Sequence, residues 1–256
     1  MRLRDILVHP SARGLNPDDP RTTLIRRRIL MEKGFLRNLY EEWYRDLIAS
    51  LPPIEGPVLE IGSGAGFLNN SLPGLITSDV FFLPHLSVVF DAGAVPFEDG
   101  SLRAVLMIDV LHHLPRPRRF FREAARCVRQ GGVVVMIEPW VTPWSTFVYS
   151  RFHTEPFEPD AGHWEFPSAG PLTGANGALP WIVFHRDRSL FEATFPDWHV
   201  SGIDLGMPFS YILSGGMTMR ALMPGFAFGF VRRLERLLGP WMDGLAMFAK
   251  IVLTRR

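Results

Sequence analysis

Three glycines at alternate positions follow a short apolar run, and this is the first pattern in the sequence that could do chemistry. The run Val-Leu-Glu-Ile at 58–61 opens into Gly62, Gly64 and Gly66. Glycines so spaced let the backbone approach a ligand closely and tolerate positive φ. A short helix expected at 67–72 would add unpaired N–H groups for a polar or anionic group. The pattern predicts a ligand-binding turn after a buried strand.

A carboxylate follows this turn at a spacing typical of nucleoside binding. Asp79 lies 79 − 62 = 17 residues after Gly62, close to the ~20 residues after which an acid holds the ribose hydroxyls. A dinucleotide fingerprint would place its third glycine at position 67, which is Phe67. A pyrophosphate ligand is therefore disfavoured, and the sequence favours a single nucleoside.

These residues must be positioned by a regular framework, and apolar runs do alternate with helical patterns along the chain. Helices are expected at 22–51, with a break at Gly34, at 117–128 and at 189–195. The expected strands are 57–61, 75–78, 88–90, 102–108, 133–137, 198–205 and 247–253. This alternation is typical of a parallel sheet covered on both faces. The predicted fold class is α/β: a doubly wound, mostly parallel seven-stranded sheet with an antiparallel C-terminal hairpin, helices on both faces and a helical cap insertion.

Acidic residues end four of the predicted strands. They are Asp79, Asp91, Asp109 and Glu138. In open α/β sheets ligands bind at the carboxyl ends of the strands. The four acids are therefore expected where a ligand would lie.

The composition excludes several classes of protein. Twenty-seven Lys+Arg against 26 Asp+Glu leave a net charge of +1 over 256 residues, which disfavours a nucleic-acid partner. The single cysteine, Cys127, excludes an internal disulfide framework and a Cys-based metal cluster. We find no signal peptide and no apolar run near the ~20 residues of a membrane span. A cytoplasmic location is expected.

Three segments resemble class I S-adenosyl-L-methionine-dependent methyltransferases, and specifically the bacterial group that methylates small molecules, lipids and sugars. They are residues 58–68, 91–114 and 126–140. The resemblance implies a Rossmann-like fold, S-adenosyl-L-methionine as cofactor and a single methyltransferase domain over 1–256. Its expected parts are an N-terminal helical segment (1–52), a cofactor-binding core (53–140), an acceptor region and cap (141–246) and the last strand (247–256).

The resemblance also implies cofactor-binding residues. Those of the glycine turn would line the methionine part of the cofactor: Glu60, Gly62, Ser63, Gly64 and Gly66. Asp79 would hold the ribose hydroxyls. Ile108 and Asp109 would lie beside the sulfonium and the acceptor.

The adenine end departs from the family pattern. Asp91 with Ala92 would bind the amino group and ring edge of adenine. The segment 81–87 lacks the helix that the family usually has there. Val80 and Phe81 are therefore the candidates for stacking on the adenine ring.

Methyl transfer from a sulfonium needs orientation and exclusion of water, and a base only where the acceptor loses a proton. His112 and His113 follow the fourth strand and Glu138 ends the fifth, so these three are the candidate catalytic residues. The alternative is that an imidazole bonds to the backbone as part of the framework. The expected acceptor atom is an oxygen of a small-molecule, sugar or lipid-linked compound.

The irregular stretch 139–185 is a candidate acceptor region. His153, Glu155, His163 and Glu165 lie in it, but they form no compact metal-binding motif. No metal is expected, and a substrate pocket is the better interpretation.

Residues 207–246 combine apolar side chains with arginines. The segment is expected to be a helical cap over the acceptor pocket, and the alternative is peripheral contact with a membrane. Two other functions stay open: a nicotinamide-dependent oxidoreductase and a non-catalytic cofactor-binding module.

Overall fold

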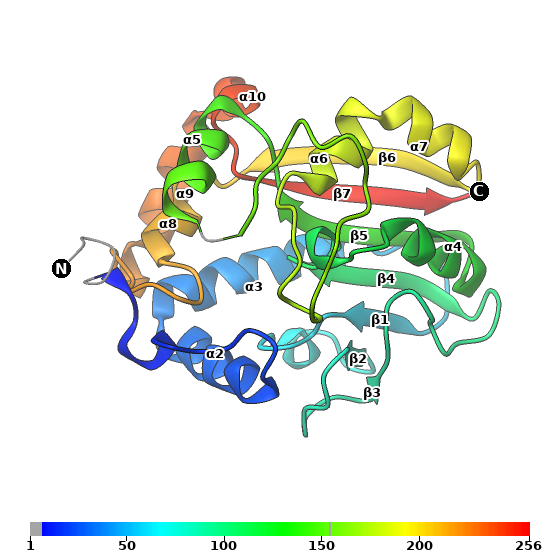
Figure 1. Ribbon diagram of the computed structural model, residues 1–256, viewed down its shortest axis with the longest axis horizontal. Coiled ribbons are helices and arrows are strands. Elements are labelled where there is room, and N and C mark those ends of the chain that lie inside the picture. Colours follow the sequence, from blue (N-terminus) through cyan, green and yellow to red (C-terminus); the bar gives the residue numbers. More distant parts are fainter. Residues whose placement is uncertain (1–6, 154) are drawn as a thin grey trace.

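The computed structural model describes residues 7–153 and 155–256. Residues 1–6, which begin the expected N-terminal segment, and Thr154, within the expected acceptor region, lie outside the described residues. One mixed sheet runs through the molecule, and Figure 1 shows helices on both of its sides.

The sheet has seven strands in the order β3-β2-β1-β4-β5-β7-β6. They are β1 (Val58–Ile61), β2 (Ile76–Asp79), β3 (Val88–Val89), β4 (Leu102–Ile108), β5 (Val128–Pro139), β6 (Trp198–Gly206) and β7 (Phe248–Arg255). The first five are parallel, and β7 runs antiparallel to both β5 and β6. The expected α/β fold class and the antiparallel C-terminal hairpin are confirmed.

The helices are α2 (Pro20–Glu32), α3 (Gly34–Ala49), α4 (Pro117–Cys127), α5 (Pro143–Phe152), α6 (Leu179–Trp181), α7 (Arg188–Thr194), α8 (Ser210–Ser214), α9 (Phe228–Leu237) and α10 (Met242–Leu245). The expected break at Gly34 is confirmed, because Lys33 separates α2 from α3. Helix α5 lies in the stretch expected to be irregular. Thr142 forms a capping box with Ser145 there, which stabilises its first turn.

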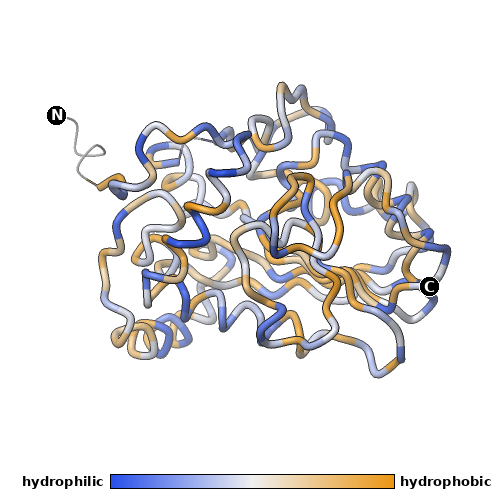
Figure 2. The backbone as a smooth tube through the Cα atoms, turned by 90° about the horizontal axis from the view of Figure 1, so that it is seen from below, coloured by the Kyte–Doolittle hydropathy of each residue, from blue (hydrophilic) through white to orange (hydrophobic). Residues whose placement is uncertain are grey.

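The central strands are mostly apolar because both faces of the sheet are covered. Along β5, Val133 and Val135 pack toward α3, whereas Val134 and Met136 pack toward α4 and α7. Figure 2 shows the resulting concentration of apolar residues along the strands at the centre of the molecule. Burial on both faces explains why these strands show no alternation of polar and apolar residues.

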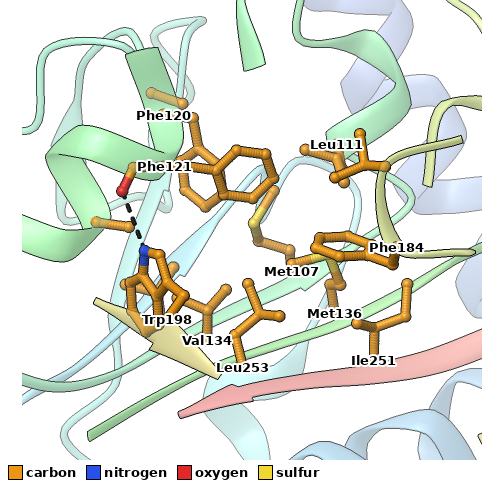
Figure 3. Close-up of a cluster of buried hydrophobic side chains, with 14 of the residues drawn as sticks. Met107, Leu111, Phe120, Phe121, Val134, Met136, Phe184, Trp198, Ile251 and Leu253 are labelled. Carbon is orange, nitrogen blue, oxygen red and sulfur yellow. Dashed lines mark hydrogen bonds between the residues drawn. The ribbon is translucent and has the colours of Figure 1, made fainter. Parts of the chain in front are cut away.

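Aromatic rings fill the face that α4 and α7 cover. Phe121 of α4 lies edge-on to Phe184 and Phe191, with ring centroids 5.8 and 5.1 Å apart. Trp198 at the start of β6 donates its indole N–H to the carbonyl of Phe121 over 3.2 Å (Figure 3). This contact ties the C-terminal hairpin to α4.

The helix expected after the glycine turn is missing from the described residues. Only a single 3-10 turn, Leu68–Asn70, follows the glycine turn, because Pro73 and Gly74 come too soon for an α-helix to form. The expected N–H groups of a helix N-terminus are therefore missing from the described residues 67–72. Residues 207–246 are helical as expected, and they form the separate helices α8, α9 and α10.

Lys33 joins the N-terminal helices to the segment after α8. Its ammonium group is buried and donates hydrogen bonds to the carbonyls of Gly216 (2.5 Å) and Met219 (2.8 Å). Burial lowers the pKa of this amine to about 8. The bonds hold the intervening residues, Met217 and Thr218, as one wall of the cavity described next.

Candidate active site

A cavity of about 460 Å³ opens at the carboxyl ends of β1, β2 and β4. The glycine turn and Asp79 line one end of it, and His112 and His113 line another. Helices α2 and α3 and the segments around 149–157 and 211–218 complete its walls. The strand ends therefore meet at one site, as the sequence predicted.

The glycine turn is held between β1 and β2 by Ser63. Its N–H donates to the carbonyl of Ser78 (2.8 Å), and the Ser78 N–H donates back to the Ser63 hydroxyl (3.1 Å). Gly62 and Gly64 have φ of +72° and +37°, a region that side chains disfavour. A Cβ on Gly62 would lie 2.4 Å from Val110 Cγ2, so glycine is required there for space as well as for conformation.

Glu60 lies beneath the turn and is almost completely buried. Its carboxylate accepts a hydrogen bond from the Ser63 hydroxyl over 2.6 Å. Burial raises the pKa of Glu60 to about 7, although the Ser63 hydrogen bond and the charge of Arg27 oppose the rise. Glu60 is therefore a buried acid that can gain or lose a proton near neutral pH.

Asp79 ends β2 and faces the glycine turn. One of its oxygens accepts the N–H of Phe81 (3.0 Å), and a Cβ on Gly64 would lie 3.3 Å from the other. Burial raises the pKa of Asp79 above its usual value. The second carboxylate oxygen of Asp79 therefore lies beside Gly64 at the cavity wall.

The residues expected at the adenine end are only partly brought together. Val80, Asp91 and Ala92 line the cavity, and Phe90 joins them. Asp91 also accepts the N–H of Gly93 over 2.7 Å. Phe81 lies outside the cavity lining, so its expected stacking role is corrected: the cavity lining includes Val80 but ends before Phe81.

Glu138 is enclosed behind the cavity and lies outside its lining, with none of its surface exposed. One oxygen accepts the N–H groups of Val110 (2.8 Å) and Leu111 (2.7 Å), and the other bonds Nδ1 of His112 (2.7 Å). The expectation that Glu138 is a catalytic residue is therefore corrected, because its side chain does not reach the cavity. Glu138 orients His112 and the turn that carries it.

Two imidazoles and a carboxylate meet at the far end of the cavity. Glu155 Oε2 lies 3.7 Å from His112 Nε2 and 3.9 Å from His113 Nε2. His113 Nδ1 lies 3.3 Å from the carbonyl of Gly174. Since both Nδ1 atoms are engaged elsewhere, both Nε2 atoms are directed at Glu155.

The charges of this group are distributed unevenly. Burial opposes charge on both imidazoles, but the hydrogen bonds to Glu138 and Glu155 raise the pKa of His112 well above its usual value. Burial and the neighbouring His112 lower the pKa of His113 to about 4. Although burial opposes its ionisation, the imidazoles hold the pKa of Glu155 well below its usual range. His112 is therefore an imidazolium paired with Glu138 and Glu155, and His113 stays neutral.

Asp109 follows β4 between the two ends of the cavity. Its backbone has φ of +61°, which is uncommon for a residue with a side chain and is found at functional sites. Its Oδ1 lies 3.9 Å from His112 Nε2. Burial raises the pKa of Asp109 to about 7. Ile108, also expected at the site, lines the cavity beside it.

The N-terminal helices contribute site residues that the sequence did not identify. Thr23, Arg26, Tyr40 and Tyr44 all line the cavity. The Tyr44 hydroxyl accepts the N–H of Phe67 over 2.9 Å, which supports the glycine turn from the side. Arg26 Nε is buried, and no described residue accepts a hydrogen bond from it. In the sequence these residues look like parts of an ordinary amphipathic helix.

Three residues of the expected acceptor region lie elsewhere or act structurally. His163 is exposed and outside the cavity lining, and Glu165 pairs with Arg118 (2.5 Å). Asn176 donates its backbone N–H to the carbonyl of His112 and exchanges hydrogen bonds with the backbone of Glu158. Asn176 therefore fastens the loop over the His112 turn.

Aromatic side chains surround the acceptor end. Tyr149 stacks on Phe157 with centroids 4.7 Å apart, and Tyr211 contacts Phe248 at 4.8 Å. All four line the cavity, together with Met217. An apolar wall with a few convergent polar groups is typical of a small-molecule site.

Known proteins share this architecture. Residues 59–136 match the family model described as a methyltransferase domain. The fold resembles geranyl diphosphate C-methyltransferase from Streptomyces coelicolor A3(2), solved with Mg²⁺, geranyl diphosphate and S-adenosyl-L-homocysteine. Sequence identity is 14% and the TM-score 0.53, over 98% of this chain and 89% of that one.

Two further structures are similar over most of their length. A geranyl diphosphate methyltransferase in complex with S-adenosylmethionine matches at 16% identity and a TM-score of 0.52, over 98% of this chain and 96% of that one. A methyltransferase from Thermotoga maritima matches at 17% identity and a TM-score of 0.53, over 92% of this chain and all of that one. These likenesses support the fold.

The glycine turn yields a test with a matched control. Gly62→Ala should lower the free energy of unfolding by about 1–2 kcal/mol for its positive φ and by about 1–3 kcal/mol more for the clash with Val110. Gly74→Ala shares the positive φ (+78°) but meets nothing within 4 Å, so only the first cost applies. Urea unfolding of both variants measures the difference. Equal losses would show that the Val110 contact has no influence.

Proposed function

We propose a reaction for this chain, whose residues 59–136 match a methyltransferase domain: transfer of the methyl group from S-adenosyl-L-methionine to an oxygen of a small-molecule acceptor. The match to the family model and the fold shared with a methyltransferase solved with S-adenosylmethionine support this class of enzyme and this cofactor. One observation carries the choice of acceptor atom. A single cavity joins the Asp79 end to a polar group of two imidazoles and Glu155.

The cofactor is proposed to lie along the carboxyl ends of β1, β2 and β4. Asp79 would accept the two ribose hydroxyls, and Asp91 with Ala92 would meet the adenine edge. Arg26, whose Nε has no partner among the described residues, would take the carboxylate of the methionine part. Glu60 would face its ammonium group. Val80 remains the candidate for contact with the adenine ring.

The acceptor is proposed to enter from the aromatic end, with its hydroxyl between Asp109 and the two Nε2 atoms. The oxygen forms a bond to the methyl carbon while the carbon–sulfur bond breaks, so the sulfonium leaves as a neutral thioether. The hydroxyl proton passes to Nε2 of His113, which is the neutral ring of the pair. Most of the rate enhancement comes from alignment and exclusion of water, since the methyl donor is already activated.

Geranyl diphosphate C-methyltransferase methylates carbon, and transfer to carbon is the main alternative for this chain. Transfer to an alkene carbon would need a site that stabilises a carbocation. The two imidazoles and Glu155 instead suit an acceptor that loses a proton from oxygen. For the nicotinamide alternative, Phe67 in place of the third glycine is the contrary observation.

The atom that receives the methyl group can be identified directly. The protein is incubated with ¹³C-methyl-labelled S-adenosylmethionine and a small-molecule extract, and the carbon chemical shift of the product distinguishes methyl on oxygen, nitrogen or carbon. We expect methyl on oxygen. His113→Ala should lower this transfer by at least about 100-fold, with cofactor affinity changed little.

His163→Ala is the matched control because that imidazole is exposed and lies outside the cavity. Its transfer rate should equal that of the wild type. A product methylated on carbon or nitrogen would refute transfer to oxygen. Absence of transfer despite tight cofactor binding would favour the non-catalytic alternative.

Cofactor binding should release a proton from Glu60. Burial raises the pKa of Glu60 to about 7 in the free protein. Of the neighbouring charges, that of Arg27 lowers this pKa and that of Asp79 raises it. The ammonium group of the bound cofactor would lower that pKa. The affinity for the cofactor should therefore rise with pH between about 5.5 and 7, by at most tenfold per pH unit, and stay constant above this range. Calorimetry in buffers of different ionisation enthalpy measures the proton released.

Glu60→Gln should abolish this proton release and flatten the pH dependence. Glu55→Gln, which alters an exposed carboxylate outside the cavity, should leave both unchanged. If Glu60→Gln releases as many protons as the wild type, another group faces the ammonium.

A second proposal concerns the surface of α9. No helix within residues 7–153 and 155–256 is long and apolar enough to cross a membrane. An exposed stripe nevertheless runs along α9 and its flanking turns at spacings of three and four residues. This α9 stripe consists of Phe226 (91% exposed), Phe230 (65%), Leu234 (47%), Leu237 (68%) and Trp241 (60%).

Exposed Arg233 and Arg236 flank the α9 stripe. Aromatic and aliphatic side chains beside arginines suit the interface of an anionic membrane. We propose that this face makes peripheral contact with such a membrane and brings a lipid-linked acceptor within reach of the cavity.

Vesicle sedimentation tests the contact. The wild type should bind vesicles that contain anionic lipid, and a Phe226→Ser, Phe230→Ser double variant should lose most of this binding. Phe82→Ser changes an equally exposed ring (75%) on another part of the surface and should have no effect. Absence of binding by the wild type would refute the membrane proposal. Residues 207–246 would then be interpreted as a helical cap over the acceptor pocket.

A further inference from the structure

The His112–His113–Glu155 group has a feature that proton transfer alone does not require. Three potential ligand atoms, two Nε2 atoms and one carboxylate oxygen, lie within 4.8 Å of one another. They come from the turn after β4 and from the loop after α5. We infer that these three side chains bind a divalent transition-metal ion at the acceptor end of the cavity.

The spacing of the ligand atoms fits one ion. Atoms about 2.0–2.2 Å from a tetrahedral zinc lie about 3.4 Å apart. The Nε2 atoms of His112 and His113 lie 3.7 and 3.9 Å from Glu155 Oε2. These two separations exceed the tetrahedral value by only about 0.3–0.5 Å.

The outer contacts of the imidazoles provide an independent argument. A metal-binding histidine usually gives its other ring N–H to a carboxylate or a backbone carbonyl, which fixes the tautomer and the ring orientation. His112 Nδ1 bonds the buried carboxylate of Glu138 at 2.7 Å, and His113 Nδ1 faces the carbonyl of Gly174 at 3.3 Å. Both arrangements leave the Nε2 lone pair for a ligand bond.

The donor set selects the class of ion. Two imidazoles and one carboxylate suit zinc or iron(II), whereas Mg²⁺ and Ca²⁺ prefer oxygen ligands. Asp109 Oδ1, 3.9 Å from His112 Nε2, lies close enough to support a further position. Since all three ligand residues line the cavity, the ion has an entry path and an open side toward the acceptor.

This inference rests on the proposed function for the acceptor and deepens it. The acceptor oxygen would bind the ion, which lowers the pKa of the hydroxyl, and its proton would be lost to water. The oxygen then forms its bond to the methyl carbon as the carbon–sulfur bond breaks. In the metal-loaded protein the imidazoles act as ligands, and neither takes the proton itself.

Metal binding can be measured without an acceptor. The full-length protein is stripped with a chelator, and Zn²⁺ is titrated by calorimetry. Co²⁺ then serves as a spectroscopic probe, because its visible absorption reports nitrogen and oxygen coordination. We expect one ion per chain and a Co²⁺ spectrum of low coordination number.

Substitutions identify the ligands. His113→Ala and Glu155→Gln should each lower Zn²⁺ affinity by at least about 100-fold, and Glu138→Gln, which keeps the shape of an outer contact, by about 10–100-fold. His163→Ala should have no effect. Circular dichroism and S-adenosylmethionine affinity verify that each variant is folded.

The outcomes separate this inference from the proposed function. A stripped protein that binds S-adenosylmethionine but no Zn²⁺ overturns the metal site and leaves the methyl transfer intact. Equal Zn²⁺ affinity in His113→Ala and the wild type also overturns it. Stoichiometric Zn²⁺ at these residues with transfer to carbon or nitrogen supports the metal site and refutes transfer to oxygen.

Discussion

The geometry of the cavity depends on one enclosed carboxylate, that of Glu138. It accepts two backbone N–H groups from the turn after β4 and bonds the ring of His112. A carboxylate without exposed surface is stable only when such partners compensate for its lost hydration. Because these partners all belong to the turn after β4, the end of β5 fixes where that turn lies. Replacing Glu138 would therefore disturb the acceptor end even though the side chain never meets an acceptor.

The two ends of the cavity are assembled in different ways. The end near Asp79 combines β1, β2, β4 and their turns with Arg26 of α2 and Tyr44 of α3. The acceptor end combines residues of α3, α5, the loop after α5 and the segment after α8. The strands and turns of the first end match the family model, and the second carries the aromatic walls. The part that matches the family model and the part that carries the aromatic walls are thus separate segments of the chain.

The sequence predicted well where local pattern and burial coincide. Strand β4 has the expected bounds, 102–108, because burial on both faces produces an apolar run that only Arg103 interrupts. The approach of Glu155 to His113 was not predictable, since the two are 155 − 113 = 42 residues apart. Asn176, which hydrogen-bonds both the His112 turn and the backbone of Glu158, is one of the contacts that bring these segments together. Helix α5 was missed because its capping box lies among prolines and tryptophans. Arg26 was missed because periodicity places an arginine on a helix but not at a cavity.

The order of the strands also affects how the protein is made. Strand β7 lies between β5 and β6 (Figure 1), although it begins 248 − 139 = 109 residues after β5 ends. During synthesis the free edge of β5 stays unpaired until β7 has left the ribosome. An unpaired apolar edge readily joins other chains. Nascent molecules should therefore depend on chaperone protection through this interval, and slow translation of the intervening region would lengthen their exposure.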